Sequence, residues 1–166
     1  MKGLIALFLI LIWFYRKPTI DIPKYMLQSN ELYSPAYGTV KRIEHIDDKY
    51  HVEMKLELWD VHIQYFPTSG EVIDQIFEPY SVETKMRNAM WEVHPKDREI
   101  RIIQGTGYIA RRIDTPRVRG SVLAGNELGM IKFGSHAKMV FSDKYKLLIR
   151  KGDSVYGPYT KIAVWN

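Results

Sequence analysis

The chain has 166 residues, enough for one domain with its own hydrophobic core. Hydrophobic residues make up 46% of it and aromatic residues 13%, which argues against a disordered protein. Because the chain contains no cysteine, disulfides, zinc–thiolate sites and thiol nucleophiles are excluded. The net charge of +5 indicates an anionic partner, either nucleic acid or an acidic membrane surface. The five histidines show no metal-ligand spacing such as HExxH, so we predict no metal site.

Residues 3–15 form an uninterrupted apolar and aromatic run, with Lys2 before it and Arg16 and Lys17 after it. The run is shorter than the ~20 residues that a membrane-spanning helix needs, and no signal-peptide cleavage site follows it. Its aromatic end beside two cations is typical of a membrane–water interface. We therefore expect residues 1–30 to be a short apolar membrane helix with a linker, followed by a cytoplasmic domain. The alternative is a core helix, which would need cover on all sides.

From Tyr33 onward the sequence has the pattern of strands and turns. Residues 52–58 alternate between apolar and charged side chains, which predicts a half-buried strand. Further strands are expected at 39–43, 62–66, 72–76, 83–93, 99–104, 130–133 and 137–141, with turns at 47–49 and 94–98. No helical period follows the apolar run, so residues 31–166 are expected to form a mainly β domain. Two glycine turns of equal spacing, 120–125 and 152–157, resemble the barrel-sandwich-hybrid motifs of carrier domains.

Gly134, Ser135 and His136 stand between two of these apolar runs. Gly134 has no side chain, so its carbonyl carbon can be approached closely. The Ser135 hydroxyl can turn back on the preceding peptide bond, and the His136 imidazole titrates near neutral pH. An ordinary turn joining two strands is the alternative interpretation of the same three residues.

This segment resembles the self-cleavage site of phosphatidylserine decarboxylases of the short type, in which a Gly-Ser bond lies within a "GxxKFGS"-like sequence. Other segments resemble that family in the same order along the chain. Residues 14–18 resemble "FFRDP", 34–40 "SPADGKV", 61–72 "VHVNRAPVDGxV", 87–89 the end of "NERNA", 103–113 "QIAGLVARRI", 125–135 "GERFGMIRFGS" and 152–157 "GDKVKAG". The resemblance extends over residues 14–163, and the shared order makes it specific.

The resemblance implies a self-processing enzyme. Ser135 would attack the Gly134 carbonyl, and the resulting ester would eliminate and hydrolyse to a pyruvoyl group with release of ammonia. Cleavage would give chains 1–134 and 135–166. The pyruvoyl cofactor would then form a Schiff base with the amine of phosphatidylserine and accept the electron pair freed by loss of carbon dioxide. His62, matching the family's histidine, would reprotonate the α-carbon; a strand histidine facing solvent is the alternative.

Four further residues depart from the pattern or gain a role from it. Tyr37 stands where the family has the aspartate thought to orient the histidine. A phenol can orient an imidazole, but it stabilises an imidazolium poorly because it is neutral. Asp60, two residues before His62, is a candidate substitute on the expectation that both share one strand face. Arg111 and Arg112 form either a solvated basic turn or a contact for the lipid phosphate.

The sequence thus predicts a mainly β, barrel-sandwich-hybrid-like phosphatidylserine decarboxylase that produces phosphatidylethanolamine at an anionic membrane surface. The first alternative is an unprocessed, inactive relative that binds anionic lipid, and Tyr37 is the feature that favours it. The second is a small basic β-barrel that binds nucleic acid, which the apolar N-terminal run argues against. We expect no nucleic-acid partner. The oligomeric state is left open, with a homodimer among the candidates.

Overall fold

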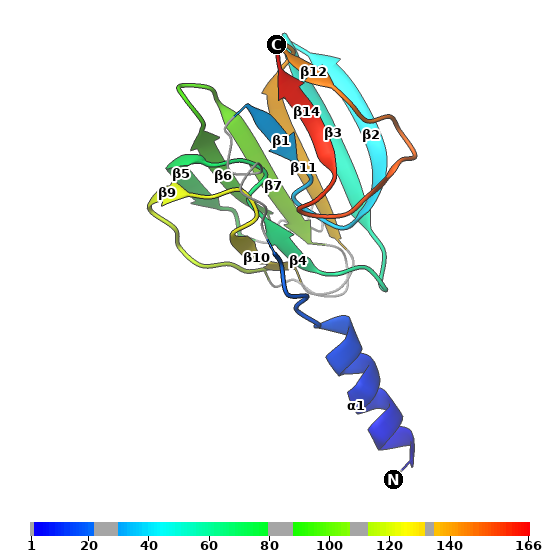
Figure 1. The fold of residues 1–166 in the computed structure, drawn as a ribbon. Helices are drawn as coiled ribbons and strands as arrows, with labels where there is room; N and C mark the ends of the chain where they lie inside the picture. The colour runs from blue at the N-terminus through cyan, green and yellow to red at the C-terminus, as the bar shows by residue number, and fades with distance from the viewer. Residues whose placement is uncertain (1, 22–29, 80–87, 107–112, 132–134) are drawn as a thin grey trace.

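The computed structural model describes residues 2–21, 30–79, 88–106, 113–131 and 135–166. Within these ranges the chain forms one helix and fourteen strands, and the helix extends away from the β domain (Figure 1). The elements are α1 (Lys2–Phe14), β1 (Glu31–Tyr33), β2 (Gly38–Ile46), β3 (Lys49–Leu56), β4 (Ile63–Tyr65), β5 (Gly70–Phe77), β6 (Asn88–His94), β7 (Ile100–Thr106), β8 (Ile113–Asp114), β9 (Gly120–Val122), β10 (Glu127–Ile131), β11 (Ser135–Ser142), β12 (Tyr145–Leu147), β13 (Ser154–Val155) and β14 (Lys161–Trp165). The mainly β prediction is confirmed.

The strands form three antiparallel sheets. The largest has the order β13-β2-β3-β11-β7-β6-β5-β9, and the two smaller ones have the orders β1-β14-β12 and β4-β10-β8. Strand β11 lies inside the large sheet, where it pairs with β3 on one side and β7 on the other. In Figure 1, β4 and β10 lie at the end of the domain from which α1 extends, and the C-terminus lies at the opposite end.

One hydrophobic core holds the large sheet and the β1-β14-β12 sheet together. Alternate residues of the central strands of the large sheet point into it, as period two requires. Fully burying a side chain of this size contributes ~1.5–3 kcal/mol, so this core is the main source of the stability of the domain. Its large members include Leu32, Val52, Met54, Phe66, Trp91, Ile100, Ile102, Leu128, Met139, Phe141, Tyr145 and Ile162.

The turn predicted at 47–49 is present, whereas the strand predicted after it is shorter than expected. Asp47 and Asp48 have φ values of 49° and 58°, the left-handed pair that a two-residue type I′ hairpin requires. The alternating run 52–58 was expected to be strand throughout, but β3 ends at Leu56. A turn closes there, because the Glu57 amide donates to Asp60 Oδ2 at 2.7 Å and the Asp60 amide donates to the Glu57 carbonyl at 3.1 Å. Leu58 is consequently 50% exposed.

The two glycine segments that resemble each other form the two edges of the large sheet. Segment 120–125 supplies β9 and segment 152–157 supplies β13, the first and last strands of the sheet order. Each segment is tied to the domain by a glycine amide: Gly125 donates to the Phe66 carbonyl and Gly152 to the Val40 carbonyl, both at 2.8 Å. The two segments of equal spacing therefore lie at opposite edges of the same sheet.

The N-terminal helix α1 has 13 residues and exposes apolar side chains, including Leu4 at 77% and Phe8 at 63%. The interpretation of this run as a buried core helix is therefore wrong. No helix in the described part of the chain has the length and apolar character needed to cross a membrane, so a membrane-spanning helix is not supported. The segment after α1 returns to the domain, where Arg16 donates to the Trp59 carbonyl at 3.0 Å and Ile20 packs near β4.

Candidate functional site

His62 lies immediately before β4 and is only 1% exposed, so the solvent-facing alternative is wrong. Its Nδ1 is 2.8 Å from the main-chain carbonyl oxygen of Asp60. A carbonyl only accepts, so Nδ1 carries the proton and Nε2 is the basic nitrogen of the ring. Burial lowers the pKa of His62, outweighing the Asp60 hydrogen bond and carboxylate, which act to raise it. The imidazole is therefore neutral at neutral pH and suited to accept a proton at Nε2.

Asp60 orients His62 through its backbone rather than its side chain. The Asp60 carboxylate accepts the Glu57 amide, which closes the turn after β3. The expectation that Asp60 and His62 share a strand face is wrong, because Asp60 lies in this turn and β4 begins only at Ile63. What fixes the imidazole tautomer is thus the Asp60 carbonyl.

His62 is bonded to the end of β10, and Ser135 begins β11, which belongs to a different sheet. At the end of β10, the Ile131 amide donates to the His62 carbonyl at 3.2 Å. Ser135 then opens β11 in the large sheet, opposite Leu56 of β3 and Thr106 of β7. The two apolar runs around the Gly-Ser-His segment therefore belong to different sheets. Gly134 lies outside the described residues, and the structure gives only the backbone placement of Ser135.

His136 lies next to Ser135 and packs against Gly105, its partner across the β11–β7 pair. A Cβ atom at position 105 would overlap the imidazole ring, so the glycine makes the space that the ring occupies. Burial lowers the pKa of His136, with Lys41 and Lys138 acting in the same direction and Glu53 opposing them. His136 alternates with the core residue Ala137, so it lies on the face of the sheet away from the core.

Tyr37 is half-buried and contacts two other tyrosines edge to face. Its ring centroid is 6.4 Å from that of Tyr65 and 6.3 Å from that of Tyr156. Burial raises the pKa of Tyr37, which keeps the phenol neutral. In the family patterns quoted above, aspartate stands at position 37 and arginine at position 65, so two departures from the pattern contact each other. A pocket of about 250 Å³ adjoins Tyr37, lined also by Trp59, Asp60, Ser154 and Tyr156.

Sequence reasoning missed two buried glutamines. Gln64 and Gln104 are both 0% exposed. The sequence did contain a signal for Gln104. It is a polar residue at an inward position of an alternating pattern, since it follows the core residues Ile100 and Ile102. Arg111 and Arg112, predicted to contact phosphate, lie outside the described residues.

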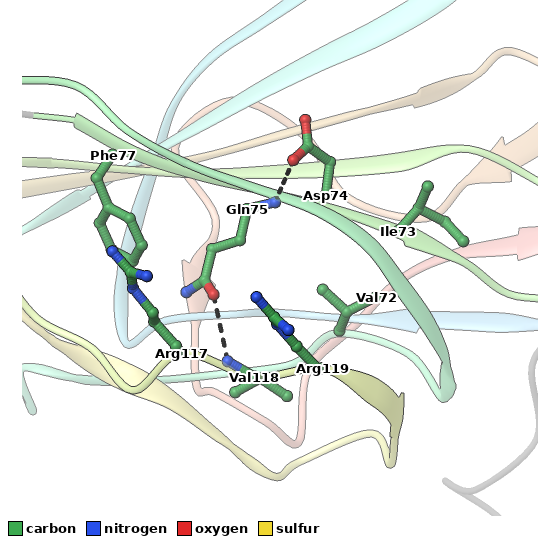
Figure 2. A pocket seen from close by; sticks show the side chains of 8 residues that line it. All are labelled: Val72, Ile73, Asp74, Gln75, Phe77, Arg117, Val118 and Arg119. Atoms are coloured by element: carbon green, nitrogen blue, oxygen red, sulfur yellow. Dashed lines mark hydrogen bonds between the residues drawn. The ribbon is translucent and has the colours of Figure 1, made fainter.

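Two other sites lie away from His62: a pocket and a cluster of titratable side chains. A pocket of about 350 Å³ lies between β5 and residues 117–119, and Figure 2 shows the side chains that line it. In it the Gln75 side chain donates to the Pro116 carbonyl at 2.9 Å and accepts the Val118 amide at 3.2 Å, which fixes this segment to β5.

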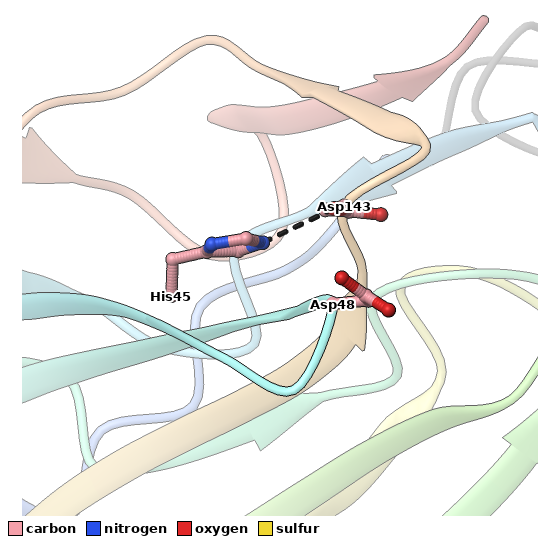
Figure 3. A group of neighbouring side chains, drawn as sticks. All are labelled: His45, Asp48 and Asp143. Carbon is pink, nitrogen blue, oxygen red and sulfur yellow. Dashed lines mark hydrogen bonds and ion pairs between the residues drawn. The ribbon is translucent and has the colours of Figure 1, made fainter.

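Figure 3 shows the cluster, His45, Asp48 and Asp143, whose polar atoms lie within 4.8 Å of one another. His45 lies near the end of β2, and Asp48 and Asp143 lie in the turns after β2 and β11, at the far end of β11 from Ser135. His45 Nε2 is 3.1 Å from Asp143 Oδ2, so the imidazole already has a carboxylate partner. The cluster is exposed or partly exposed, and the absence of a metal site stays a prediction.

Comparison with known proteins gives a consistent result. The family model described as phosphatidylserine decarboxylase matches residues 7–162. A phosphatidylserine decarboxylase proenzyme of Carboxydothermus hydrogenoformans is 30% identical, over 95% of this chain and 80% of that protein. Proteins of the same name from Chlorobium phaeobacteroides and Syntrophus aciditrophicus are 28% and 31% identical, over 97% and 86% of this chain and 82% and 74% of theirs. No solved structure matches. The chain belongs to the phosphatidylserine decarboxylase family.

Proposed function

We propose that this protein is a pyruvoyl-dependent phosphatidylserine decarboxylase made as a proenzyme that cleaves itself between Gly134 and Ser135. The products would be chains 1–134 and 135–166. Family membership over most of the chain supports the reaction, and the relatives' name of proenzyme supports self-processing. The observation that carries the proposal is a buried, neutral His62 whose carbonyl is bonded to the strand that leads to Ser135.

His62 has the properties that both proton transfers require. With Nδ1–H held by the Asp60 carbonyl, Nε2 can take the proton of the Ser135 hydroxyl as that oxygen attacks the Gly134 carbonyl. In the decarboxylation, the same nitrogen can return a proton to the α-carbon of the product. The pyruvoyl group made from Ser135 would supply the electron sink for that reaction. The proposed formation of this group depends on the position of Ser135, which follows a glycine and begins the strand of a different sheet.

Tyr37 favours a second candidate function, an unprocessed relative that binds anionic lipid. Its neutral phenol cannot stabilise a protonated imidazole as a carboxylate would, and burial strengthens its neutrality. The contact of its ring with Tyr65 makes the surroundings of position 37 apolar rather than ionic. We retain self-processing as the main proposal because the Asp60 carbonyl, not position 37, holds the His62 tautomer.

We further propose that residues 1–30 attach the β domain of residues 31–166 to the cytoplasmic face of an anionic membrane. The exposed apolar side chains of α1 support an interfacial position, and Arg16 and Lys17 suit an anionic surface. Figure 1 shows α1 at the same end of the domain as β4, so attachment there would bring His62 near the lipid. Arg111 and Arg112 would contact the phosphate. The two glycine segments, which supply the edge strands β9 and β13 of the large sheet, support a barrel-sandwich-hybrid-like arrangement.

The test is the chain composition of the purified protein. We expect intact mass and gel analysis to give a large and a small chain, the small one blocked to Edman chemistry because its first residue is a ketone. Ser135→Ala should remain whole and inactive, since alanine has no nucleophile. Tyr37→Asp should split as fast as the wild type or faster. Splitting in Tyr37→Asp alone would identify an unprocessed relative, and absence of splitting in both would refute the pyruvoyl mechanism.

A further inference from the structure

Gln64 and Gln104 are two amides buried in the interior of the domain. Both side chains are 0% exposed, and in each of them neither Nε2 nor Oε1 has a hydrogen-bond partner in the described part of the chain. Leaving a buried donor or acceptor unsatisfied costs ~1–3 kcal/mol. Native proteins contain few such groups, and each needs an explanation. Several other described side chains leave one buried polar atom unpaired, but only these two leave both a donor and an acceptor unpaired, which indicates that a polar ligand is missing from this part of the interior.

The two amides face the same interior from different sheets. Around β4, Ile63 and Tyr65 pack in the separate cluster that includes Tyr37, whereas Phe66 belongs to the main core. Alternation then directs Gln64, with His62, towards the main core. Gln104 follows Ile100 and Ile102 on the inner face of β7. The sheets approach each other there, because β10, the partner of β4, contacts β7 directly.

Small residues flank both amides. Gln104 pairs with Ala89 on β6 and with Ala137 on β11, and both alanines are 0% exposed. Gln64 pairs with Gly129 on β10. These neighbours have the two smallest side chains, so they leave lateral room beside each carboxamide. Ala137 is two residues from Ser135 on the same strand, which places Gln104 close to the origin of the reactive group.

Resting on the proposed function, we propose that the Gln64 and Gln104 carboxamides form the subsite that receives the carboxylate of the phosphatidylserine head group. Each Nε2 carries two donors that can bond to carboxylate oxygens. When the bond from the α-carbon to the carboxylate breaks, its electron pair stays on the α-carbon side, and carbon dioxide leaves neutral. The α-carbon then takes a proton from His62 Nε2, which must first accept that proton from water in each turnover, because the resting imidazole is neutral.

Neutral donors suit this reaction better than a cation would. An arginine would stabilise the carboxylate most strongly in the bound substrate, before its charge moves away, and would oppose decarboxylation. In a buried site of low dielectric this difference is large. Among the described residues, no buried polar side chain carries a charge, since these side chains are serine, threonine, glutamine and the neutral His62.

The experiment replaces each amide by leucine, which is apolar and similar in size. For Gln64→Leu and Gln104→Leu we expect unchanged splitting into two chains, a melting temperature equal to or above wild type, and a kcat/KM for phosphatidylserine about 10- to 100-fold lower. Gln75→Leu is the control, because its amide is satisfied at both ends: it donates to the Pro116 carbonyl and accepts the Val118 amide, the second bond being drawn in Figure 2. It should melt at a lower temperature and keep the wild-type turnover.

A binding measurement separates the subsite from other effects on turnover. Soluble glycerophosphoserine should raise the melting temperature of the processed wild type more than glycerophosphoethanolamine, which lacks the carboxylate. That difference should vanish in both leucine variants. Wild-type kcat/KM in both variants would overturn the subsite, and so would a loss of splitting, which would assign the amides to the precursor instead. Failure of the proposed function itself is distinct, because the wild type would then remain a single chain.

Discussion

The two ends of strand β11 have opposite surroundings. At the Ser142 end, the Phe141 ring lies 5.7 Å from Tyr145, which in turn lies 4.8 Å from Trp165, and the Arg98 guanidinium covers Trp165 at 4.6 Å. At the Ser135 end, the inner face of the neighbouring strands carries buried polar side chains, with Thr106 and Gln104 on β7 and His62 before β4.

This difference separates stability from chemistry within a single strand. Edge-to-face aromatic pairs add ~0.5–1.5 kcal/mol each beyond the area that they bury, so the Ser142 end stabilises the fold. Unsatisfied amides and an imidazole held neutral by burial reduce stability at the Ser135 end. Such destabilising groups persist where a protein uses them, and the two amides that leave both polar atoms unpaired lie at the Ser135 end, which we therefore take as the functional one. Substitutions at the two ends should therefore have different consequences.

The largest effect is expected for His62→Ala. Loss of a general acid or base lowers a rate by about 10²–10⁴-fold, whereas the β fold should remain intact because His62 is not one of the apolar residues that form the core. Steady-state turnover and far-ultraviolet circular dichroism on the same sample would measure both. His45→Ala, at the exposed far end of β11, is the control and should turn over normally. Normal turnover in His62→Ala would remove this residue from the mechanism.

At the opposite end, Phe141→Ala should act on stability alone. Truncating a buried phenylalanine costs ~3–5 kcal/mol, and this ring is 0% exposed with contacts to Tyr50 and Tyr145. Urea unfolding should show this loss, while turnover per folded molecule stays near wild type at temperatures below melting. A selective loss of turnover in a fully folded sample would contradict the separation of the two ends.

Gly105→Ala tests the Ser135 end by adding an atom rather than removing one. The new Cβ would overlap the His136 ring, and such overpacking costs ~1–3 kcal/mol. Combining it with His136→Ala should recover most of that loss, because the clash then has no partner. Chemical denaturation of the four proteins in this cycle gives the coupling energy. Additive effects would show that the ring and the glycine do not interact.

Alternation in residues 52–58 predicted β3, since one apolar face packs on one core, and the other apolar runs predicted most of the remaining long strands. The short strands β1, β8, β9, β12 and β13 and the C-terminal β14 were not predicted. The end of β3 at Leu56 was not predictable, because the alternation continues to Leu58 and only the Glu57–Asp60 turn interrupts it. The motif resemblance identified His62 but placed its partner on a side chain, whereas a backbone carbonyl holds it. Carbonyl directions follow from the fold, so residue types cannot reveal them. Gln64 and Gln104 were missed for the same reason: their lack of partners is a property of the packed interior.

The smallest expected effect is a dependence of stability on pH that originates at the Ser135 end. Burial lowers the pKa of both His62 and His136 in the folded protein, while the unfolded chain keeps the ordinary histidine value of about 6.5. Between those values the unfolded chain binds more protons than the folded one, so acid favours unfolding. The free energy of unfolding should therefore be constant above about pH 7 and fall as the pH drops below about 6.5.

Urea unfolding at closely spaced pH values between 5 and 8 would measure this slope, and His62→Gln and His136→Gln should each reduce it, since glutamine does not titrate. Comparing each variant with wild type at the same pH cancels the carboxylates, including Glu31, whose pKa is lowered although burial acts to raise it, because its bonds to Lys161 and Tyr33 outweigh that burial. A slope of the opposite sign, with stability rising as the pH falls, would mean that the folded protein holds these imidazoles charged. His62 would then be unable to accept the Ser135 proton, and the contrast between the two ends of β11 would lose its chemical basis.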